Sequence, residues 1–509
     1  MEPVSRMDGR RCWPGDLLAL MAGLLLPLAF SPFDFYPLAI LSPALLFFSW
    51  QGAAPRRALQ RGAFYGLGMF GAGVSWIFVS IHKYGHVPAG LSVLLTVLFV
   101  LVLAVFPALS GWLAAHLERH CRKLSPALAL VLIYPAVWVL GEWVRGWFLT
   151  GFPWLNLGYS QIDAPLAALA PLLGVYGVSY FTALSGALLL AAMVHRGGVI
   201  LGRYLVILVA LWVGAGLLST VHWTRPAGSF IKVSLVQGNI PQDLKWQPAM
   251  RDATVDLYSR LSRRHWDSDL IIWPETAMPM FYRQAQPYLR ALAKEARDHN
   301  TELLVGLIYR DPAQQRYYNS MVGVGGKIAF YHKRHLVPFT EYLPFATVLG
   351  DVVDLLDVPM SDFSAGAATQ PPLELAGQKV AVSICYEDAF GEEFIRALPE
   401  ATLLVNVSND AWFAGSIAPA QHLQIARMRA LETGRFLLRA TNTGLSAIVD
   451  PHGDIVAASP PFREHVLSAS VLPMTGATPY VRLGNYPAVL LPALLLAGLV
   501  ALEWRTKSK

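Results

Sequence analysis

Three side chains suited to acid–base or nucleophilic chemistry stand at the ends of apolar, β-rich runs. Glu275 ends IIWPE, Lys333 ends FYHK, and Cys385 ends VSIC, directly before a tyrosine and two acidic residues. A thiol of pKa about 8.5 is mostly protonated at neutral pH, so it needs a nearby base or cation to act as a nucleophile. A carboxylate supplies the base, and an ammonium neutralises charge on an attacked carbonyl oxygen. The three residues therefore predict covalent catalysis by a cysteine.

Each residue also has a purely structural interpretation. A lone strand cysteine is most often a small buried hydrophobe, Glu275 could cap a helix, and Lys333 could be a solvated surface cation. The other two of the three cysteines, Cys12 and Cys121, lie in arginine-rich segments far from Cys385, which has no evident disulfide partner. The catalytic interpretation therefore requires that the three side chains meet.

The composition indicates a membrane protein. Of the 509 residues, 54% are hydrophobic and 15% are charged, and the mean hydropathy is +0.43. A helix of about 20 apolar residues, at about 1.5 Å per residue, crosses a hydrocarbon core of about 30 Å. Uncharged apolar runs of sufficient length are 62–81, 87–115, 164–194, 204–221 and 483–502.

Three shorter apolar segments complete a prediction of about eight transmembrane helices. The segment 126–141 ends before Glu142 and Arg145 and can extend if these charges face the protein interior. The segments 13–30 and 35–50 are separated by SPFDF, which is typical of a turn, and they could be two tight spans or one re-entrant hairpin. No small-residue cleavage site follows the first segment, so we expect it to be retained.

Positive charge is distributed unevenly over the predicted loops. The short loops on the far side from the termini carry only Lys83 and Arg145. The termini and the loops on their side carry Arg6, Arg10, Arg11, Arg56, Arg57, Arg61, Arg119, Arg122, Lys123, Arg196, Arg203, Arg505, Lys507 and Lys509. This bias predicts cytoplasmic termini and an extracytoplasmic segment between spans seven and eight. The net charge of +6 reflects membrane orientation and gives no reason to expect a nucleic-acid partner.

The segment 226–482 holds most of the acidic residues and alternates β-rich runs with helical patterns. Strand-like runs are FIKVSLVQGNI, SDLIIWPETAM, TELLVGLIYR, SMVGVGGKIAFYHK, KVAVSICYEDA, ATLLVNVSND and LSAIVDPHGDIVAAS. Apolar residues recur with helical spacing at 250–264, 284–299 and 419–437. Apolar strands between helices predict sheets covered by helices. We expect a membrane domain at 1–225, a soluble α/β domain at 226–482, and a last span with a cytoplasmic tail at 483–509.

The order of Glu275, Lys333 and Cys385, each at the end of a strand, resembles the catalytic triad of the carbon–nitrogen hydrolase (nitrilase) superfamily. The resemblance covers essentially all of 226–482 and implies an α-β-β-α sandwich. It implies that Glu275 is the general base, that Lys333 stabilises the oxyanionic intermediate, and that Cys385 is the nucleophile. An unpaired thiol outside the cytoplasm faces oxidising conditions, which favours a shielded cysteine that is used.

A nitrilase-like domain inserted before the last span of a membrane protein resembles a narrower family, the apolipoprotein N-acyltransferases of the bacterial inner membrane. The stretches that carry this resemblance are LTGFPWLNLGYSQID, VQGNIPQDLKW, WPETAMP, HKRHLVPFTEYLP, CYEDAF, NVSNDAWF and QHLQIARMRALETGRFLLRATNTG. No triad position departs from the family pattern. The resemblance implies a periplasmic catalytic domain.

This resemblance implies a ping-pong acyl transfer. Cys385 would attack the sn-1 ester of a phospholipid, with phosphatidylethanolamine as the expected donor, and release a lysophospholipid from a thioester acyl-enzyme. The α-amino group of the diacylglyceryl cysteine of an apolipoprotein would then accept the chain as an amide. Glu341, Tyr386 and Glu387 carry over as supporting active-site residues. The expected partners are this donor, this acceptor and membrane lipid, and we expect a monomer without a cofactor.

Three further residues are implied to lie on the substrate path: Trp246 and Trp412 as walls or gates of the acyl route, and Gly151 as a functional membrane-loop glycine. The tryptophans could instead be interfacial anchors, and Gly151 could simply serve a turn with positive φ. The histidines of HVPAG and HKRH are not spaced with carboxylates as metal ligands, and no glycine-rich phosphate loop is present. We therefore expect no metal site.

Two other functions remain open. A membrane-anchored amidase with the same triad would use water as its second substrate and act on a small amide. A transporter regulated by its soluble domain would be expected to contain internal repeats, and no convincing repeat is found. The apolar residues of 339–366 favour contact with lipid, and we expect this stretch to be a lid that opens toward the bilayer. The alternative is an ordinary surface loop.

Overall fold

The computed structural model describes residues 13–194, 198–344, 362–413 and 415–507. The chain divides into two compact units. Unit 1 comprises Met1–Phe78, Pro88–Val221 and Asn485–Lys509. Unit 2 comprises His222–Gly484 together with Val79–Val87, a short segment that separates two predicted spans. The predicted soluble domain 226–482 thus falls within unit 2.

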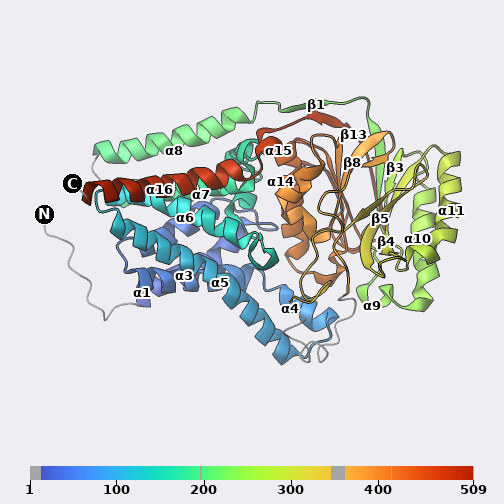
Figure 1. Ribbon diagram of the computed structural model, residues 1–509, viewed down its shortest axis with the longest axis horizontal. Helices are drawn as coiled ribbons and strands as arrows, with labels where there is room; N and C mark the ends of the chain where they lie inside the picture. The colour runs from blue at the N-terminus through green and yellow to red at the C-terminus, as the bar shows by residue number, and fades with distance from the viewer. Residues whose placement is uncertain (1–12, 195–197, 345–361, 414, 508–509) are drawn as a thin grey trace. The chain divides into compact units, whose positions relative to one another are not determined.

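Unit 1 consists of apolar helices (Figure 1). They are α1 (Trp13–Leu25), α2 (Leu38–Trp50), α3 (Pro55–Gly73), α5 (Ala89–His120), α6 (Pro126–Arg145), α7 (Ala170–Val194), α8 (Gly198–Leu218) and α16 (Tyr486–Lys507). Among the described residues, five helices are long and apolar enough to cross a membrane. A sixth span results if α3 and Ile77–Tyr84, which are bent by 56°, are counted together. Because α1 and α2 are short, the total of about eight spans stays a prediction.

Helix α6 continues past the predicted end at residue 141, as expected if its charges face inward. Glu142 and Arg145 are both buried, with 3% and 2% of their surface exposed. Arg145 donates to the carbonyl oxygen of Phe152 at 2.7 Å and to Asn156 Oδ1 at 2.7 Å. The backbone N–H of Leu157 donates to Glu142 Oε1 at 2.9 Å. The two charges therefore hold the loop that follows α6.

Unit 2 contains two six-stranded sheets within its described residues. The first has the order β13-β2-β3-β4-β5-β6. Its strands are β2 (Ile231–Gln237), β3 (Leu270–Ile272), β4 (Glu302–Arg310), β5 (Tyr317–Val324), β6 (Phe330–His332) and β13 (His465–Val471). The second has the order β12-β11-β10-β9-β8-β7. Its strands are β7 (Leu373–Leu375), β8 (Gln378–Ile384), β9 (Leu403–Ser408), β10 (Leu437–Thr441), β11 (Ala447–Val449) and β12 (Ile455–Ala458). A short pair, β1 (Thr224–Pro226) and β14 (Met474–Gly476), lies apart.

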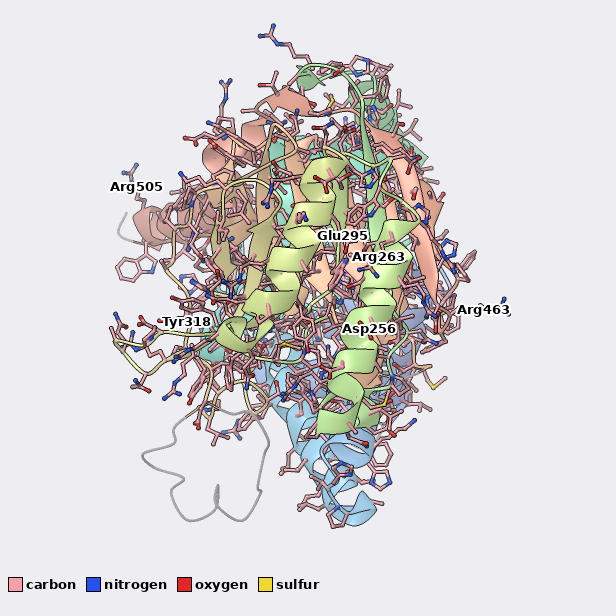
Figure 2. All side chains as sticks on the ribbon, turned by 90° about the vertical axis from the view of Figure 1, so that its right-hand side faces the viewer. Asp256, Arg263, Glu295, Tyr318, Arg463 and Arg505 are labelled. Carbon is pink, nitrogen blue, oxygen red and sulfur yellow. The ribbon has the colours of Figure 1, made fainter. Side chains whose placement is uncertain are left out.

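The two sheets pack face to face between helices. Side chains alternate along each strand, so Leu270 and Ile272 of β3 face the other sheet, while Ile271 packs with the helices α10 (Arg251–Arg263) and α11 (Tyr282–Asp298). Helix α14 (Ala418–Thr433) covers the second sheet (Figure 1). Arg263 and Glu295 join α10 to α11 through two hydrogen bonds of 2.8 and 2.9 Å (Figure 2). This is the α-β-β-α sandwich that the resemblance implied.

The structure differs from the sequence prediction at the end of one helix and in strands that were not predicted. The predicted helix 419–437 ends at Thr433, because Gly434 adopts the left-handed conformation with φ of +64° and terminates it. Strand β10, which begins at Leu437, the last residue of that stretch, was not predicted as a strand. Strand β13, which pairs antiparallel with β2, was not predicted at all. Its sequence HVLSASV carries serines on a half-exposed edge strand, and these weaken the apolar signal.

Candidate active site

Three strand ends of unit 2 carry the predicted triad. Glu275 follows β3, Lys333 follows β6 directly, and Cys385 opens the 3₁₀ turn η7 (Cys385–Ala389) after β8. The first two strands belong to one sheet and β8 to the other. The backbone N–H of Arg334, next to Lys333, donates to Glu387 of the Cys385 turn at 2.7 Å, so the two sheets contribute to one constellation, in which Glu275 raises and Lys333 lowers the pKa of Cys385.

Lys333 is the buried cation of this constellation. Its side chain is 1% exposed, and its Nζ lies 2.9 Å from Glu341 Oε1 and 3.7 Å from Glu275 Oε1. Burial alone would lower the pKa of Lys333, but Glu341 and Glu275 more than offset this, and the pKa is raised. Lys333 is therefore a permanent ammonium between two carboxylates.

Asparagines and a lysine hold Glu275 in place. Asn319 of β5 donates from Nδ2 to Glu275 Oε1 at 2.7 Å and to Glu341 Oε1 at 3.2 Å. The backbone N–H of Asn409 donates to Glu275 Oε2 at 2.9 Å, and Lys245 Nζ donates to the Glu275 carbonyl oxygen at 3.1 Å. Sequence reasoning missed Asn319 and Asn409. A polar residue inside an apolar strand, as Asn319 is in YYNSMVGV, was the available signal.

Cys385 occupies a strained turn. Its φ is +53°, a left-handed conformation that is rare for residues with a side chain, and the residue is half-buried. Burial raises the pKa of Cys385 and the charge of Glu275 raises it further, whereas Lys333 and a hydrogen bond with Ser408 oppose the shift. The thiol is therefore protonated at rest, and its proton must leave as the sulfur attacks.

Glu387 links η7, called the nucleophile turn below because Cys385 opens it, to the segment that carries Lys333. Its Oε1 accepts from the backbone N–H groups of Arg334 at 2.7 Å and His335 at 3.1 Å. Its Oε2 accepts from the backbone N–H of Ile384 at 2.6 Å and from the Tyr331 hydroxyl at 2.9 Å. The carboxylate therefore acts as a clamp, which explains why an acid is needed two residues after Cys385.

The other two supporting residues lie beside this clamp. Glu341 accepts the backbone N–H of Val337 on Oε2 at 2.8 Å, so both of its oxygens are occupied. The ring of Tyr386 meets those of Phe390 and His335 edge to face, with centroids 5.1 and 5.9 Å apart. Tyr386 thus forms part of an aromatic wall next to the nucleophile.

The predicted path residues lie in different surroundings. Trp412 contacts Tyr84 of the segment Val79–Val87 within unit 2, with ring centroids 6.0 Å apart. Trp246 ends the short helix α9 (Gln242–Lys245), directly after Lys245, and is half-buried. Gly151 belongs to unit 1, where its φ of +88° and the carbonyl oxygen of Gly146, 2.2 Å from where a Cβ would stand, require glycine. The places of Gly151, Trp246 and Trp412 on a substrate path stay predictions.

The expected lid falls largely outside the described residues. Residues 345–361 of the stretch 339–366 are not described. At its start, Phe339 is 57% exposed and adopts a φ of +64°. The lid therefore stays a prediction. Within the described part of the chain, no group of three or more histidine, cysteine, aspartate or glutamate side chains is arranged to hold a metal ion.

Comparisons with known proteins cover almost the whole chain. Residues 22–188 match the family model of the apolipoprotein N-acyltransferase N-terminal domain, and residues 232–480 match the carbon-nitrogen hydrolase model. An apolipoprotein N-acyltransferase of Methylococcus capsulatus is 50% identical over 93% of each chain. One of Nitrosomonas europaea is 46% identical over 97% of this chain and 98% of that one. The chain belongs to the apolipoprotein N-acyltransferase family.

Two solved structures resemble about half of this apolipoprotein N-acyltransferase family member. The NitFhit protein of C. elegans is 20% identical, covers 50% of this chain and 63% of that chain, and has a TM-score of 0.39. Saccharomyces cerevisiae Nit3, of the nitrilase superfamily, is 19% identical, covers 53% of this chain and 97% of that chain, and has a TM-score of 0.37. The family assignment rests on the full-length relatives.

Proposed function

We propose that the protein transfers an acyl chain from the sn-1 position of a phospholipid, through a thioester on Cys385, to the α-amino group of the diacylglyceryl cysteine of an apolipoprotein. The observation that carries the proposal is the buried Lys333 ammonium beside Glu275 and Glu341, with its charge acting on Cys385. The name shared by relatives that match almost the whole chain supports the choice of substrates.

In the first half-reaction, the Cys385 sulfur attacks the ester carbonyl carbon while Glu275 takes the thiol proton. Negative charge develops on the carbonyl oxygen, and the Lys333 ammonium stabilises it without a proton transfer of its own. The bond from carbon to the glycerol oxygen then breaks. Glu275 returns its proton to that oxygen, which leaves as the hydroxyl of a lysophospholipid, and Cys385 carries the acyl chain as a thioester.

In the second half-reaction, the neutral amino group of the acceptor attacks the thioester carbon. Glu275 takes a proton from the nitrogen, Lys333 again faces the oxyanion, and the carbon–sulfur bond breaks. The sulfur recovers a proton from Glu275, so the enzyme returns to its starting state and the product is an amide. One nucleophile serves both halves, which predicts ping-pong kinetics.

We further propose that the enzyme is a monomer in the bacterial inner membrane, with both termini in the cytoplasm and the catalytic unit in the periplasm. The apolar helices of unit 1 and the bias of Lys and Arg toward the loops on the side of the termini support this orientation. A membrane-impermeant maleimide applied to intact cells tests it. With the labelled residue located by peptide mass, a cysteine introduced at exposed Glu464 should be modified, and one introduced at Arg122 should not.

The test of the reaction is intact-mass analysis of the purified protein with phosphatidylethanolamine that carries acyl chains of different length at sn-1 and sn-2. We expect one adduct with the mass of the sn-1 chain, located on Cys385, which disappears when a diacylglyceryl peptide is added. Cys385→Ala is the control and should show no adduct. An adduct on Cys385→Ala, or none on the unchanged protein, would contradict the proposal. If the unchanged protein forms no adduct but hydrolyses a small amide, the alternative function of a membrane-anchored amidase is favoured.

A further inference from the structure

A buried cluster of four charged side chains lies directly behind the nucleophile. His422 comes from α14, Asp388 from η7, Asp410 from the 3₁₀ turn η9 (Asp410–Phe413), and Arg439 from β10. None of the four is more than 3% exposed. They are called the His422 cluster below. The triad does not include any of them, so their burial needs an explanation of its own.

The ring of His422 lies between two carboxylates. Its Nδ1 is 3.2 Å from Asp410 Oδ1, and its Nε2 is 2.9 Å from Asp388 Oδ1. An ionised carboxylate only accepts hydrogen bonds, so both ring nitrogens must carry protons and the ring is an imidazolium. A neutral imidazole would leave one nitrogen lone pair facing a carboxylate oxygen in a buried site.

Arg439 completes the cluster and balances its charge. Its guanidinium donates to Asp388 Oδ2 at 3.2 Å and to Asp410 Oδ2 at 3.0 Å. Burial and Arg439 alone would lower the pKa of His422, but Asp388 and Asp410 raise it to about 9. With His422 protonated, two positive and two negative charges sum to zero. If His422 lost its proton, one net negative charge would remain beside the thiol.

The His422 cluster reaches Cys385 in two ways, directly at its carbonyl oxygen and through Ser408 at its side chain. The Cys385 carbonyl oxygen accepts from Asn406 Nδ2 at 3.2 Å and lies 3.3 Å from His422 Nε2. Ser408, which hydrogen-bonds the Cys385 side chain, donates to Asp410 Oδ1 at 2.8 Å. A left-handed residue with a side chain costs about 1–3 kcal/mol and persists only where its surroundings fix it. The carbonyl contacts supply that constraint.

We propose that His422, held as an imidazolium between Asp388 and Asp410, is a positioning residue for Cys385. It fixes the strained turn through the Cys385 carbonyl oxygen, and it cancels the carboxylate charge that would otherwise oppose thiolate formation. Asp410 is among the groups that raise the pKa of Cys385, so the neutralisation acts on the reacting sulfur. The inference rests on the proposed function only in taking Cys385 as the nucleophile.

The test compares four versions of the full-length protein in detergent by the rate at which iodoacetamide alkylates Cys385 at neutral pH, followed by peptide mass. His422→Gln keeps a donor near the position of Nε2 but removes the positive charge. We expect alkylation to slow about tenfold or more, the effect of raising the thiol pKa by about one unit. Adding Asp410→Asn to His422→Gln restores a net charge of zero and should recover a substantial part of the lost rate.

The matched control is Glu432→Gln. Glu432 is buried on the same helix, ten residues from His422, and pairs with Arg429 at 3.1 Å. Its loss should lower the unfolding temperature without slowing alkylation of Cys385. Recovery of the alkylation rate in the double variant would show that the charge, and not a structural defect, slowed His422→Gln. Two structural defects would be expected to add and not to compensate. Equal slowing in Glu432→Gln, or no recovery in the double variant, would overturn the proposal.

A second measurement covers the case in which His422→Gln does not fold. The rate of thioester formation from phospholipid in the unchanged protein should fall as the pH rises through about 9, where His422 loses its proton. Asp410→Asn removes one carboxylate facing His422 and leaves Asp388 and Arg439, so the fall should move to lower pH while KM for phospholipid changes less than about twofold. If the rate of thioester formation falls at the same pH in Asp410→Asn as in the unchanged protein, His422 does not have the proposed role. Absence of any thioester, with the alkylation pattern intact, contradicts the proposed function instead.

Discussion

Lys333 lies closer to Glu341 than to Glu275: Nζ to Oε1 is 2.9 Å for the first pair and 3.7 Å for the second. The shorter contact fixes the ammonium, and the longer one leaves the Glu275 carboxylate able to take a proton. A single carboxylate in contact with a buried ammonium would be a poor base, because the ion pair favours its ionised form. Glu341 therefore holds Lys333, and Glu275 accepts the protons.

Glu341→Gln tests this division. Without Glu341, the ammonium is expected to close on Glu275, which lowers the basicity of the carboxylate that must accept the thiol proton. Thioester formation should slow by about 10²-fold, the usual contribution of a positioned general base. Single-turnover acylation followed by intact mass measures it. Glu374→Gln, at an exposed glutamate of β7, is the control and should react at the unchanged rate.

Lys333→Arg should abolish measurable acylation although it keeps the charge. The planar guanidinium is larger than an ammonium, and Glu275 and Glu341 beside Nζ are both held by hydrogen bonds from Asn319. Lys379→Arg, at an exposed lysine on the strand that leads to Cys385, should leave acylation unchanged. Acylation of Lys333→Arg at a rate near that of the unchanged protein would show that only the charge matters and not its placement.

The strand ends could be predicted from sequence because local signals mark them. An apolar run that ends in Pro274 predicts where a strand stops. Glu275 must then lie just beyond the end of that strand. That Lys333 lies beside Glu275 and Glu341 was implied only by the family resemblance, because local strand signals do not show which strand ends meet. Strands β8 and β9 also formed where apolar residues predicted them, but each is shorter than the predicted run, because Cys385 and Asp410 begin 3₁₀ turns.

The rest depends on contacts between segments far apart in the chain. Asn409 holds Glu275 across 134 residues, and no local pattern near either residue reports the pairing. His422 belongs to α14, a helix that is buried on nearly every side. The sequence of such a helix does not show whether a histidine only packs in the core or has charged partners. Only the fold shows that Asp388 and Asp410 reach it from two different turns.

Glu387→Gln tests the clamp between the nucleophile turn and the Lys333 segment. An amide presents only one acceptor oxygen, so its NH₂ group would face two of the four donors that Glu387 satisfies. Each buried donor left unpaired costs about 1–3 kcal/mol, and the unfolding temperature should fall by roughly 5–10 °C. Differential scanning fluorimetry in detergent measures it. An unchanged unfolding temperature together with lost acylation would mean that Glu387 contacts substrate and is not a clamp.

The buried side chain of Lys245 predicts how the stability of the folded protein changes with pH. It is 2% exposed, and burial lowers its pKa from 10.5 to about 8, with Glu275 opposing the shift. Between these two values the unfolded chain binds a proton that the folded protein does not. Stability therefore rises with pH across this window, and below pH 8 the lysine is charged in both states and its burial opposes folding. The whole effect is about 3 kcal/mol.

Lys245→Met removes this titration while keeping an unbranched apolar stem. The unfolding temperature of the unchanged protein should rise relative to that of the variant by several degrees between about pH 7 and pH 10. The variant should also acylate more slowly, because the Glu275 carbonyl oxygen loses the donor that lies 3.1 Å away and the base is less firmly held. Lys379→Met, at the exposed lysine, should show no such difference with pH. Parallel pH curves for Lys245→Met and the unchanged protein would mean that Lys245 titrates alike in the folded and unfolded states, and its burial would then impose no electrostatic penalty.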